Sequence, residues 1–404
     1  MNAHELREVA RALRTTTEVL AAELARPTPQ PPDWSPFEWR IARAAASLHG
    51  VSGLLHEALP WSDPEPWLAF LRDQAGHTAR RYARITDLLR SIDDTARRHG
   101  VALIGLKGTA LRRRGSYAPG VRPMSDVDLL VAEEDAPRAR IVLSALGYRE
   151  RYTTRRHLVL EPENCPRPAS FGEHAENGIA IELHTRISEH LPVREIELTS
   201  GLWPVDAAPG LNGYASAAAL MAHVLLHAAG SMVGNGLRLL HLQDISRLAR
   251  SFEEGDWTAL QAFGEGRRGL WWAWPPLALA ARTFGGIPED VLRGTAGGCP
   301  ALLRRRCGRS AVTDFSLSQP WIDAFPGLLW SASPAEMARY GLRRFIPSRA
   351  QLRARRDTAR TEAIFSDTAW QGLSQVQRIL RHVASRQPRV ATMYVVRGAL
   401  AQRT

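Results

Sequence analysis

The spacing of apolar residues changes twice along the chain, and this change constrains the fold more than any other feature. Before residue 99 apolar side chains recur three or four positions apart, which is typical of amphipathic helices. From residue 101 to about 187 they alternate or form short continuous runs, as in strands, and the helical spacing returns from about residue 214. We therefore predict an α+β protein with a helical region at 1–98, a small mixed-sheet domain at 99–205 and a helical domain at 206–404.

The central segment predicts a short sheet interrupted by helices. We expect strands at 101–106, 126–131, 157–163 and 179–187, and helices at 109–115 and 137–148. Later helical patterns lie near 335–345 and 360–385.

The first residues and the most apolar later stretch predict a cytoplasmic protein without a membrane span. The first ten residues, MNAHELREVA, are polar and charged, so we expect no secretory signal and a cytoplasmic protein. The apolar stretch 270–281 is too short for a bilayer span and contains two prolines. We predict that it forms a buried helix pair or turn, and that the protein has no membrane partner.

The basic residues are almost all arginine. The net charge of +11 favours phosphorylated partners, but the arginines are spread along the chain, and we interpret runs such as 112–114 and 304–306 as solvated surface. Only one of the 52 basic residues is a lysine, Lys107. Because ammonium and guanidinium groups differ in size, hydration and hydrogen-bond geometry, we expect Lys107 to have a function.

Three acidic residues form the pattern of a divalent metal site. Asp126 and Asp128 share one face of their predicted strand, because strand side chains alternate. Two carboxylates this close repel each other unless a cation lies between them, and oxygen ligands favour Mg²⁺ or Mn²⁺. Glu182 and His184 share a face of the last predicted strand. We predict that Asp126, Asp128 and Glu182 are the metal ligands and catalytic residues, with Glu182 also accepting a proton.

Phosphate-binding groups are expected just before the two aspartates. Gly108 and Thr109 begin the short helix predicted after the first strand, where free amides attract phosphate. Lys107 and Arg122 are candidates to neutralise triphosphate oxygens. The candidate nucleotide-binding residues are therefore Lys107, Gly108, Thr109, Arg122, Ser125 and His184; for His184 a purely structural role stays open.

These motifs resemble the uncharacterised nucleotidyltransferase family of the DNA-polymerase-beta-like nucleotidyltransferase superfamily. The resemblance covers roughly residues 85–250: a lysine-glycine step after a strand, an arginine, a D-x-D strand and a glutamate-leucine-histidine strand. Arg238 and Asp244 match a recurrent arginine and aspartate of that family. The resemblance implies a palm-like sheet, two-metal catalysis and C-terminal helices that shape the acceptor site.

We therefore expect a metal-dependent nucleotidyltransferase. It would transfer a nucleoside monophosphate from a nucleoside triphosphate, with ATP as the expected donor, to a hydroxyl of a small molecule, sugar, peptide or protein. The alternative is a catalytically weak module that binds nucleotide or nucleic acid, as an antitoxin-like component would. The intact carboxylates argue against this alternative, and nucleic acid is a partner that we do not favour. His223 and His227 have the spacing of half a metal site, and we interpret them as core histidines.

Overall fold

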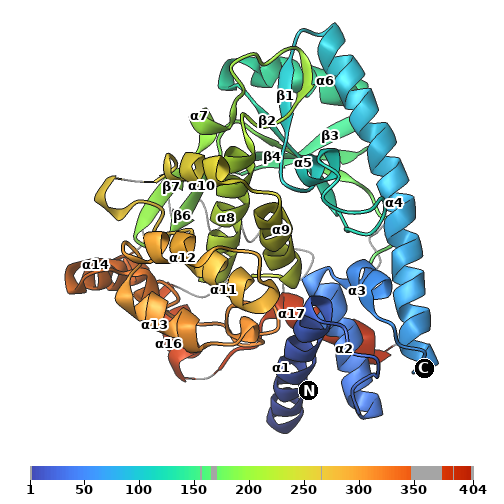
Figure 1. The fold of residues 1–404 in the computed structure, drawn as a ribbon, viewed down its shortest axis with the longest axis vertical. Helices are drawn as coiled ribbons and strands as arrows, with labels where there is room; N and C mark the ends of the chain where they lie inside the picture. The colour runs from blue at the N-terminus through green and yellow to red at the C-terminus, as the bar shows by residue number, and fades with distance from the viewer. Residues whose placement is uncertain are drawn as a thin grey trace.

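Helices form the part of the chain that precedes the sheet: α1 (Ala3–Ala25), α2 (Pro36–His49), α3 (Ser52–Ala58) and α4 (Glu65–Arg98). The computed structural model describes residues 2–154, 157–164, 171–264, 266–346, 375–384 and 386–401. Ser35 and Glu38 form a capping box at the start of α2, and Gly50, with a φ of 64°, ends that helix in the left-handed conformation. The long α4 runs along one side of the molecule from the N-terminal helices to the sheet (Figure 1).

Six strands form a mixed sheet in the order β3-β4-β5-β2-β1-β8. Their bounds are β1 Ala102–Gly105, β2 Asp126–Val131, β3 Tyr148–Thr153, β4 His157–Pro162, β5 Ala180–His184 and β8 Gly210–Asn212. β2 is parallel to β5 and β1 is parallel to β8, whereas the other neighbours are antiparallel. β6 (Ser188–Leu191) and β7 (Arg194–Glu197) form a separate hairpin.

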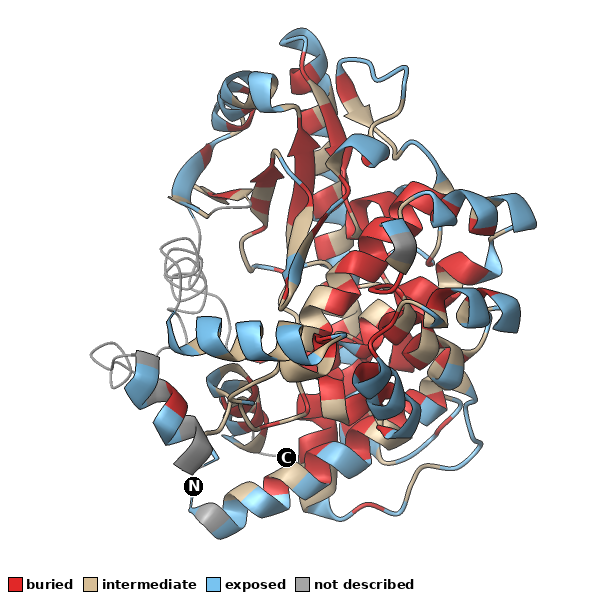
Figure 2. Cartoon of the chain, turned by 90° about the vertical axis from the view of Figure 1, so that its left-hand side faces the viewer, coloured by how far each residue is buried: buried red, intermediate tan, exposed pale blue. Residues whose placement is uncertain are grey.

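The two faces of this sheet pack against different helices. On one face, Val127 and Ile181 belong to a core that includes Ile85 of α4 and Val142 of α6 (Ala136–Ala145). On the opposite face, residues such as Leu130 belong to the main core of the molecule, which includes much of the C-terminal helices. Figure 2 shows that both the central strands and these helices are largely buried. The second face is therefore covered by helices far away in sequence.

The short helix α5 (Gly108–Arg113) lies between β1 and β2. The remaining helices follow β5 and form the C-terminal part of the molecule: α7 Thr199–Leu202, α8 Ala217–Val233, α9 Leu239–Arg250, α10 Glu254–Gln261, α11 Trp274–Phe284, α12 Glu289–Ala296, α13 Ala301–Arg309, α14 Pro334–Phe345, α16 Gln375–Ala384 and α17 Val390–Ala401. Short 3₁₀ helices lie at Glu133–Asp135, Gly266–Arg268, Val312–Phe315 and Leu328–Trp330. α17 packs against α2, so the last helix lies beside the first ones (Figure 1).

The predicted α+β class, a small mixed sheet flanked by helical regions, is confirmed. The strand predicted at 126–131 has these bounds in the structure. The helix predicted at 137–148 ends earlier, because α6 ends at Ala145 and Tyr148 is the first residue of β3. The sequence analysis missed the edge strands β3 and β8. The helix expected at 360–385 lies mostly outside the described residues, which include its end as α16.

The apolar stretch 270–281 is a buried turn and helix. Leu270, Trp271 and Trp272 are almost fully buried, and α11 begins at Trp274 with prolines in its first turn. Within the described ranges, no helix combines the length and the apolarity needed to cross a membrane. The division of the chain at residues 98 and 205 stays a prediction.

Candidate active site

The register between β2 and β5 brings the predicted acidic residues to one face of the sheet. Asp126 lies opposite Ala180 and Asp128 lies opposite Glu182, and paired residues of neighbouring strands point to the same side. Both strands begin at a fixed place because the buried guanidinium of Arg81, on α4, donates to the carbonyls of Ser125 and Asn177 at 3.0 and 2.8 Å. Glu182 therefore faces the aspartate pair, as the metal-site prediction requires.

The three carboxylates line one cavity of about 350 Å³ between the sheet and the helices that cover it. Its wall combines residues from the N-terminal helices, the sheet and the C-terminal helices, among them Gly50, Lys107, Arg122, Ser125, Arg238 and Asp244. A smaller cavity of about 120 Å³ shares Lys107, Glu182 and His227 with it. We call the larger one the acidic cavity.

Lys107 reaches the acidic residues from an unusual turn after β1. Its backbone has a φ of 43°, which is a strained conformation for a residue other than glycine. The hydroxyl of Tyr214 accepts a hydrogen bond from the Lys107 amide at 3.1 Å and so holds this turn. From there the ammonium group donates to Asp128 Oδ1 at 2.9 Å. The one lysine of the chain is thus a direct ionic partner of a predicted metal ligand.

Two histidines lie beside Glu182. His184 Nε2 is 3.2 Å from Asp128 Oδ1 and 3.5 Å from Glu182 Oε2, so its imidazole bridges the two carboxylates. His157, at the start of β4, pairs in register with His184, and its Nε2 is 3.7 Å from Glu182 Oε2. The sequence analysis missed His157, because the antiparallel pairing of β4 with β5 has no local signal; its position at the start of a predicted strand was the one available clue.

The pKa values of the acidic residues diverge. Burial, together with repulsion from Asp128 and Glu182, raises the pKa of Asp126. Burial also acts to raise the pKa of Asp128, but Lys107 and His184 outweigh it and hold that pKa well below its usual range. For Glu182 burial is opposed mainly by the hydrogen bond from His184, and its pKa is lowered. Asp126 is thus the carboxylate whose nearby cations do not outweigh burial and repulsion.

The pKa values of the two basic groups, Lys107 and His184, are both raised. Burial acts to lower the pKa of Lys107, but the charges of Asp128, Glu182 and Asp126 outweigh it, so the pKa is raised. Burial likewise opposes protonation of His184, whereas its hydrogen bonds to Asp128 and Glu182 raise its pKa. The protonated forms of Lys107 and His184 are therefore the forms that compensate Asp128 and Glu182.

The residues fit a divalent cation at Asp126. The carboxylate of Asp126 has no hydrogen bond or ion pair with any residue that the structure describes, although it lies half-buried beside two other acidic groups. Carboxylate oxygens suit Mg²⁺ and Mn²⁺. His157, Glu182 and His184 also offer ligand atoms within 4.8 Å of one another, and imidazole nitrogens would favour Mn²⁺ over Mg²⁺.

Arg122 is engaged with Asp244. Its guanidinium donates to both carboxylate oxygens of Asp244, at 2.9 and 2.7 Å, and Tyr117 donates to the same carboxylate at 2.7 Å. This bidentate pair joins the loop before β2 to α9. A Cβ at Gly108 would lie 2.6 Å from Arg122 Nη1, so Gly108 permits this close approach. Arg122 lines the acidic cavity, but most of its hydrogen-bonding capacity is used within the protein.

Arg238 is the guanidinium that remains available in the acidic cavity. It is exposed, it precedes α9, and its side chain forms no hydrogen bond or ion pair within the described ranges. Its positive charge acts to lower the pKa of Asp126, so the two side chains interact across the cavity.

Of the remaining residues named in the sequence analysis, only some line the acidic cavity. Ser125 is exposed and lines the acidic cavity. Thr109 lines a separate cavity on the other side of β1 and α5, and its amide donates to the carbonyl of Leu106 at 3.0 Å. α5 itself has only six residues. His223 is hydrogen-bonded to Tyr214 at 2.8 Å, and His227 packs against the ring of His241.

The mixed sheet presents the D-x-D strand, the third acidic residue and the lysine on which the sequence resemblance to nucleotidyltransferases rests. The model of the family described as uncharacterised nucleotidyltransferase matches residues 35–285, and the chain belongs to this family. The match includes α2, the sheet and helices α8 and α9, all of which contribute residues to the wall of the acidic cavity. No curated protein and no solved structure matches the chain.

Proposed function

We propose that the protein is a metal-dependent nucleotidyltransferase whose acidic cavity binds a nucleoside triphosphate. The observation that carries this proposal is the unpaired carboxylate of Asp126 beside Asp128, Glu182 and Lys107 on one face of the sheet. Asp126, Asp128 and Glu182 would hold Mg²⁺ or Mn²⁺, which would neutralise phosphate charge and orient the triphosphate. ATP is the donor to test first.

Several side chains have distinct roles in this proposal. Arg238 would bind phosphate oxygens, because its guanidinium is available in the cavity. Lys107 would orient Asp128, and Gly108 and Ser125 would border the nucleotide. His184 would fix Glu182 through its bridging contact. Arg122 would shape the cavity through Asp244.

The reaction proposed is a displacement at the α-phosphorus. A hydroxyl oxygen of the acceptor forms the new bond to phosphorus, the bond to the β-phosphate oxygen breaks, and pyrophosphate leaves. Glu182, ionised at neutral pH because its pKa is lowered, would accept the hydroxyl proton. The acceptor is a small molecule, sugar, peptide or protein, and the proposed compartment is the cytoplasm, where triphosphates are abundant.

Calorimetric titration of the full chain with ATP and each other nucleoside triphosphate tests the proposal. We expect at least one triphosphate to bind in the presence of Mg²⁺ or Mn²⁺, and binding to require Asp126 and Asp128. The variants are Asp126→Asn and Asp128→Asn; the control is Asp290→Asn, an exposed aspartate on α12. Absence of triphosphate binding at millimolar concentration, or metal-dependent binding that is unchanged in both variants, would refute it.

A further inference from the structure

A second cavity, larger than the acidic one, lies on the other side of β1 and α5. Its volume is about 640 Å³, and it is bounded by α4, α5, the segment 211–214 and the start of α8. None of the residues that line it also lines the acidic cavity. We call it the basic cavity.

Guanidinium groups dominate its wall. Five arginines line it, Arg90 and Arg97 from α4 and Arg112, Arg113 and Arg114 from the end of α5, against the single carboxylate of Asp93. Asp93 is already paired, because it accepts hydrogen bonds from Arg97 and from the amide of Leu211. The run 112–114, which the sequence analysis interpreted as solvated surface, therefore gives this cavity a strong positive charge.

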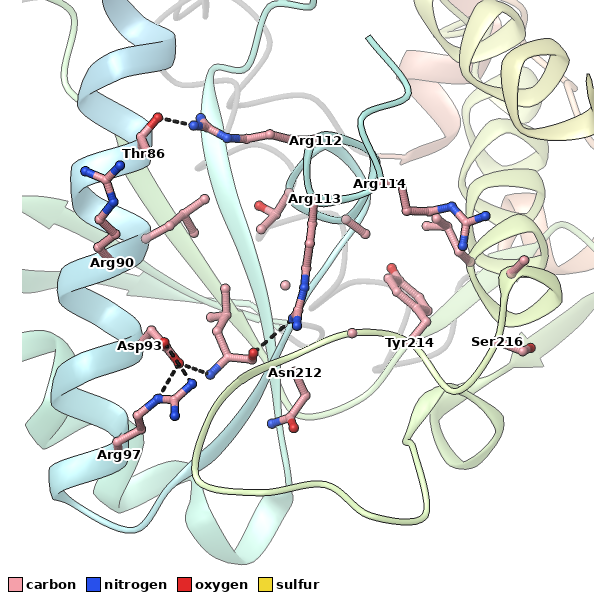
Figure 3. A pocket seen from close by; sticks show the side chains of 18 residues that line it. Thr86, Arg90, Asp93, Arg97, Arg112, Arg113, Arg114, Asn212, Tyr214 and Ser216 are labelled. Atoms are coloured by element: carbon pink, nitrogen blue, oxygen red, sulfur yellow. Dashed lines mark hydrogen bonds and ion pairs between the residues drawn. The ribbon is translucent and has the colours of Figure 1, made fainter. Parts of the chain in front are cut away.

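The three arginines of the run point in different directions (Figure 3). Arg112 reaches α4, where it donates to the Tyr82 carbonyl and the Thr86 hydroxyl. Arg113 extends towards the segment 211–212 and uses one nitrogen to donate to the Leu211 carbonyl at 3.0 Å. Arg114 extends towards α8, and its side chain forms no hydrogen bond or ion pair in the part of the chain described. Arg113 and Arg114 thus have donors available to a ligand.

Thr109 provides an independent indication of a ligand. Its side chain is 4% exposed and lines the basic cavity, and its hydroxyl has no hydrogen-bond partner among the described residues. A buried hydroxyl without a partner carries a desolvation cost. A ligand oxygen at this wall would satisfy it once the Thr109 side chain turns its hydroxyl towards the cavity.

We propose that the basic cavity binds a small phosphorylated molecule. Phosphate presents several acceptor oxygens, and the wall offers guanidinium and hydroxyl donors with one neutralised carboxylate. The volume suits a small molecule, since ligand cavities measure about 300–1,000 Å³. Tyr214 lies at the wall, and its hydroxyl holds the Lys107 amide, so the ligand would lie next to the acidic cavity without entering it.

Titration calorimetry with inorganic pyrophosphate, in buffer containing EDTA, tests this proposal without any metal at the acidic cavity. We expect saturable binding to the full chain. In the double variant Arg113→Ala/Arg114→Ala, Kd should rise by about tenfold or more, equivalent to about 1.4 kcal/mol.

The matched control is Arg304→Ala/Arg305→Ala. These exposed arginines on α13 form a similar pair, because Arg304 donates to a backbone carbonyl and Arg305 has no hydrogen bond or ion pair within the described residues. This control should change Kd by less than about twofold. Thr109→Val, which replaces the hydroxyl with a methyl group, should also weaken pyrophosphate binding without lowering the free energy of unfolding.

Four results would overturn the proposal: no binding at millimolar pyrophosphate, equal binding by the Arg113→Ala/Arg114→Ala variant, equally tight binding of citrate, or displacement of pyrophosphate by a single-stranded oligonucleotide. The last two would indicate a general anion site and a nucleic-acid surface, respectively. Each of these results leaves the proposed nucleotidyl transfer intact, because the titration contains no divalent metal and no triphosphate.

Discussion

Asp126 and Asp128 are two residues apart on one strand, yet their carboxylates have opposite electrostatic environments. The pKa of Asp126 is raised by burial and by its acidic neighbours, whereas Lys107 and His184 hold the pKa of Asp128 down. In metal-free buffer at about pH 8, the folded protein keeps Asp126 ionised at a free-energy cost. Asp126→Asn removes this cost and should raise the free energy of unfolding by about 1 kcal/mol. Asp128→Asn removes a stabilised charge and should lower it.

Urea denaturation of the two variants at several pH values measures this difference. The gain in Asp126→Asn should shrink progressively as the pH falls from the raised pKa of Asp126 towards the ordinary carboxyl pKa, because in that range the folded wild-type protein binds a proton there that the unfolded chain does not. Both variants should lose metal-dependent triphosphate binding. A less stable Asp126→Asn variant at about pH 8 would contradict the electrostatic account of the site.

Lys107 combines a strained backbone with a short ionic contact. Its ammonium lies 2.9 Å from Asp128 Oδ1, and the turn that places it is held by Tyr214. The planar guanidinium introduced by Lys107→Arg is larger than the ammonium group and should displace the carboxylate of Asp128. We expect triphosphate binding or transfer to fall by about tenfold, a loss of about 1.4 kcal/mol, whereas the exposed Arg305→Lys should have no effect. Equal effects in both variants would show that the single lysine has no special role.

His49 connects three elements through a buried imidazole. Its Nδ1 accepts from the amide of Leu239 at the start of α9, and its Nε2 lies 2.9 Å from the hydroxyl of Ser318. Thr17 of α1 is hydrogen-bonded to the same hydroxyl. Burial, and to a lesser extent the charge of Arg238, lowers the pKa of His49 to about 3. The neutral imidazole is therefore the form that holds these elements together.

This lowered pKa predicts a loss of stability in acid. The unfolded chain binds a proton at His49 near pH 6.5, but the folded chain does not do so until about pH 3. Between these values the free energy of unfolding should fall with decreasing pH, by at most about 1.4 kcal/mol per pH unit from this group. Other buried histidines add to the slope in the same direction, so the test compares wild type with His49→Gln by urea denaturation. An unchanged slope in His49→Gln would exclude His49 as the cause.

The elements that the sequence predicted best are those with an unambiguous apolar pattern. β2 alternates two acidic residues with Val127 and Leu129 and was predicted with its exact bounds. β3 was missed because its sequence, YRERYT, is mostly exposed at the sheet edge, and β8 has only three residues. Such strands form because a neighbour offers free backbone groups, which a local pattern does not contain. The sequence analysis grouped Asp126, Asp128 and Glu182 because each lies on a strand with a clear alternating pattern. It missed His157 because the pairing of β4 with β5 has no local pattern.

At the scale of the whole molecule, the candidate site does not belong to one region of the chain. The acidic cavity takes Gly50 from the N-terminal helices, the carboxylates from the sheet, and His227 and Asp244 from α8 and α9. The sheet face that carries the carboxylates contributes Leu130 to the main core, which also contains α8. The geometry of the candidate site is therefore coupled to the packing of helices that begin after the sheet.

This arrangement predicts that residues 99–205 do not fold alone. Such a fragment lacks Ile85 and Ile92 of α4, which cover one sheet face, and α8, which covers the other. It also lacks β8, so the backbone groups of β1 would become an unpaired edge. We expect the fragment to lack near-ultraviolet circular dichroism and slow amide exchange at Val127 and Ile181, whereas the full chain protects both amides. A monomeric fragment that unfolds cooperatively would show instead that the sheet requires neither set of helices, and that the acidic site is fixed by the strands alone.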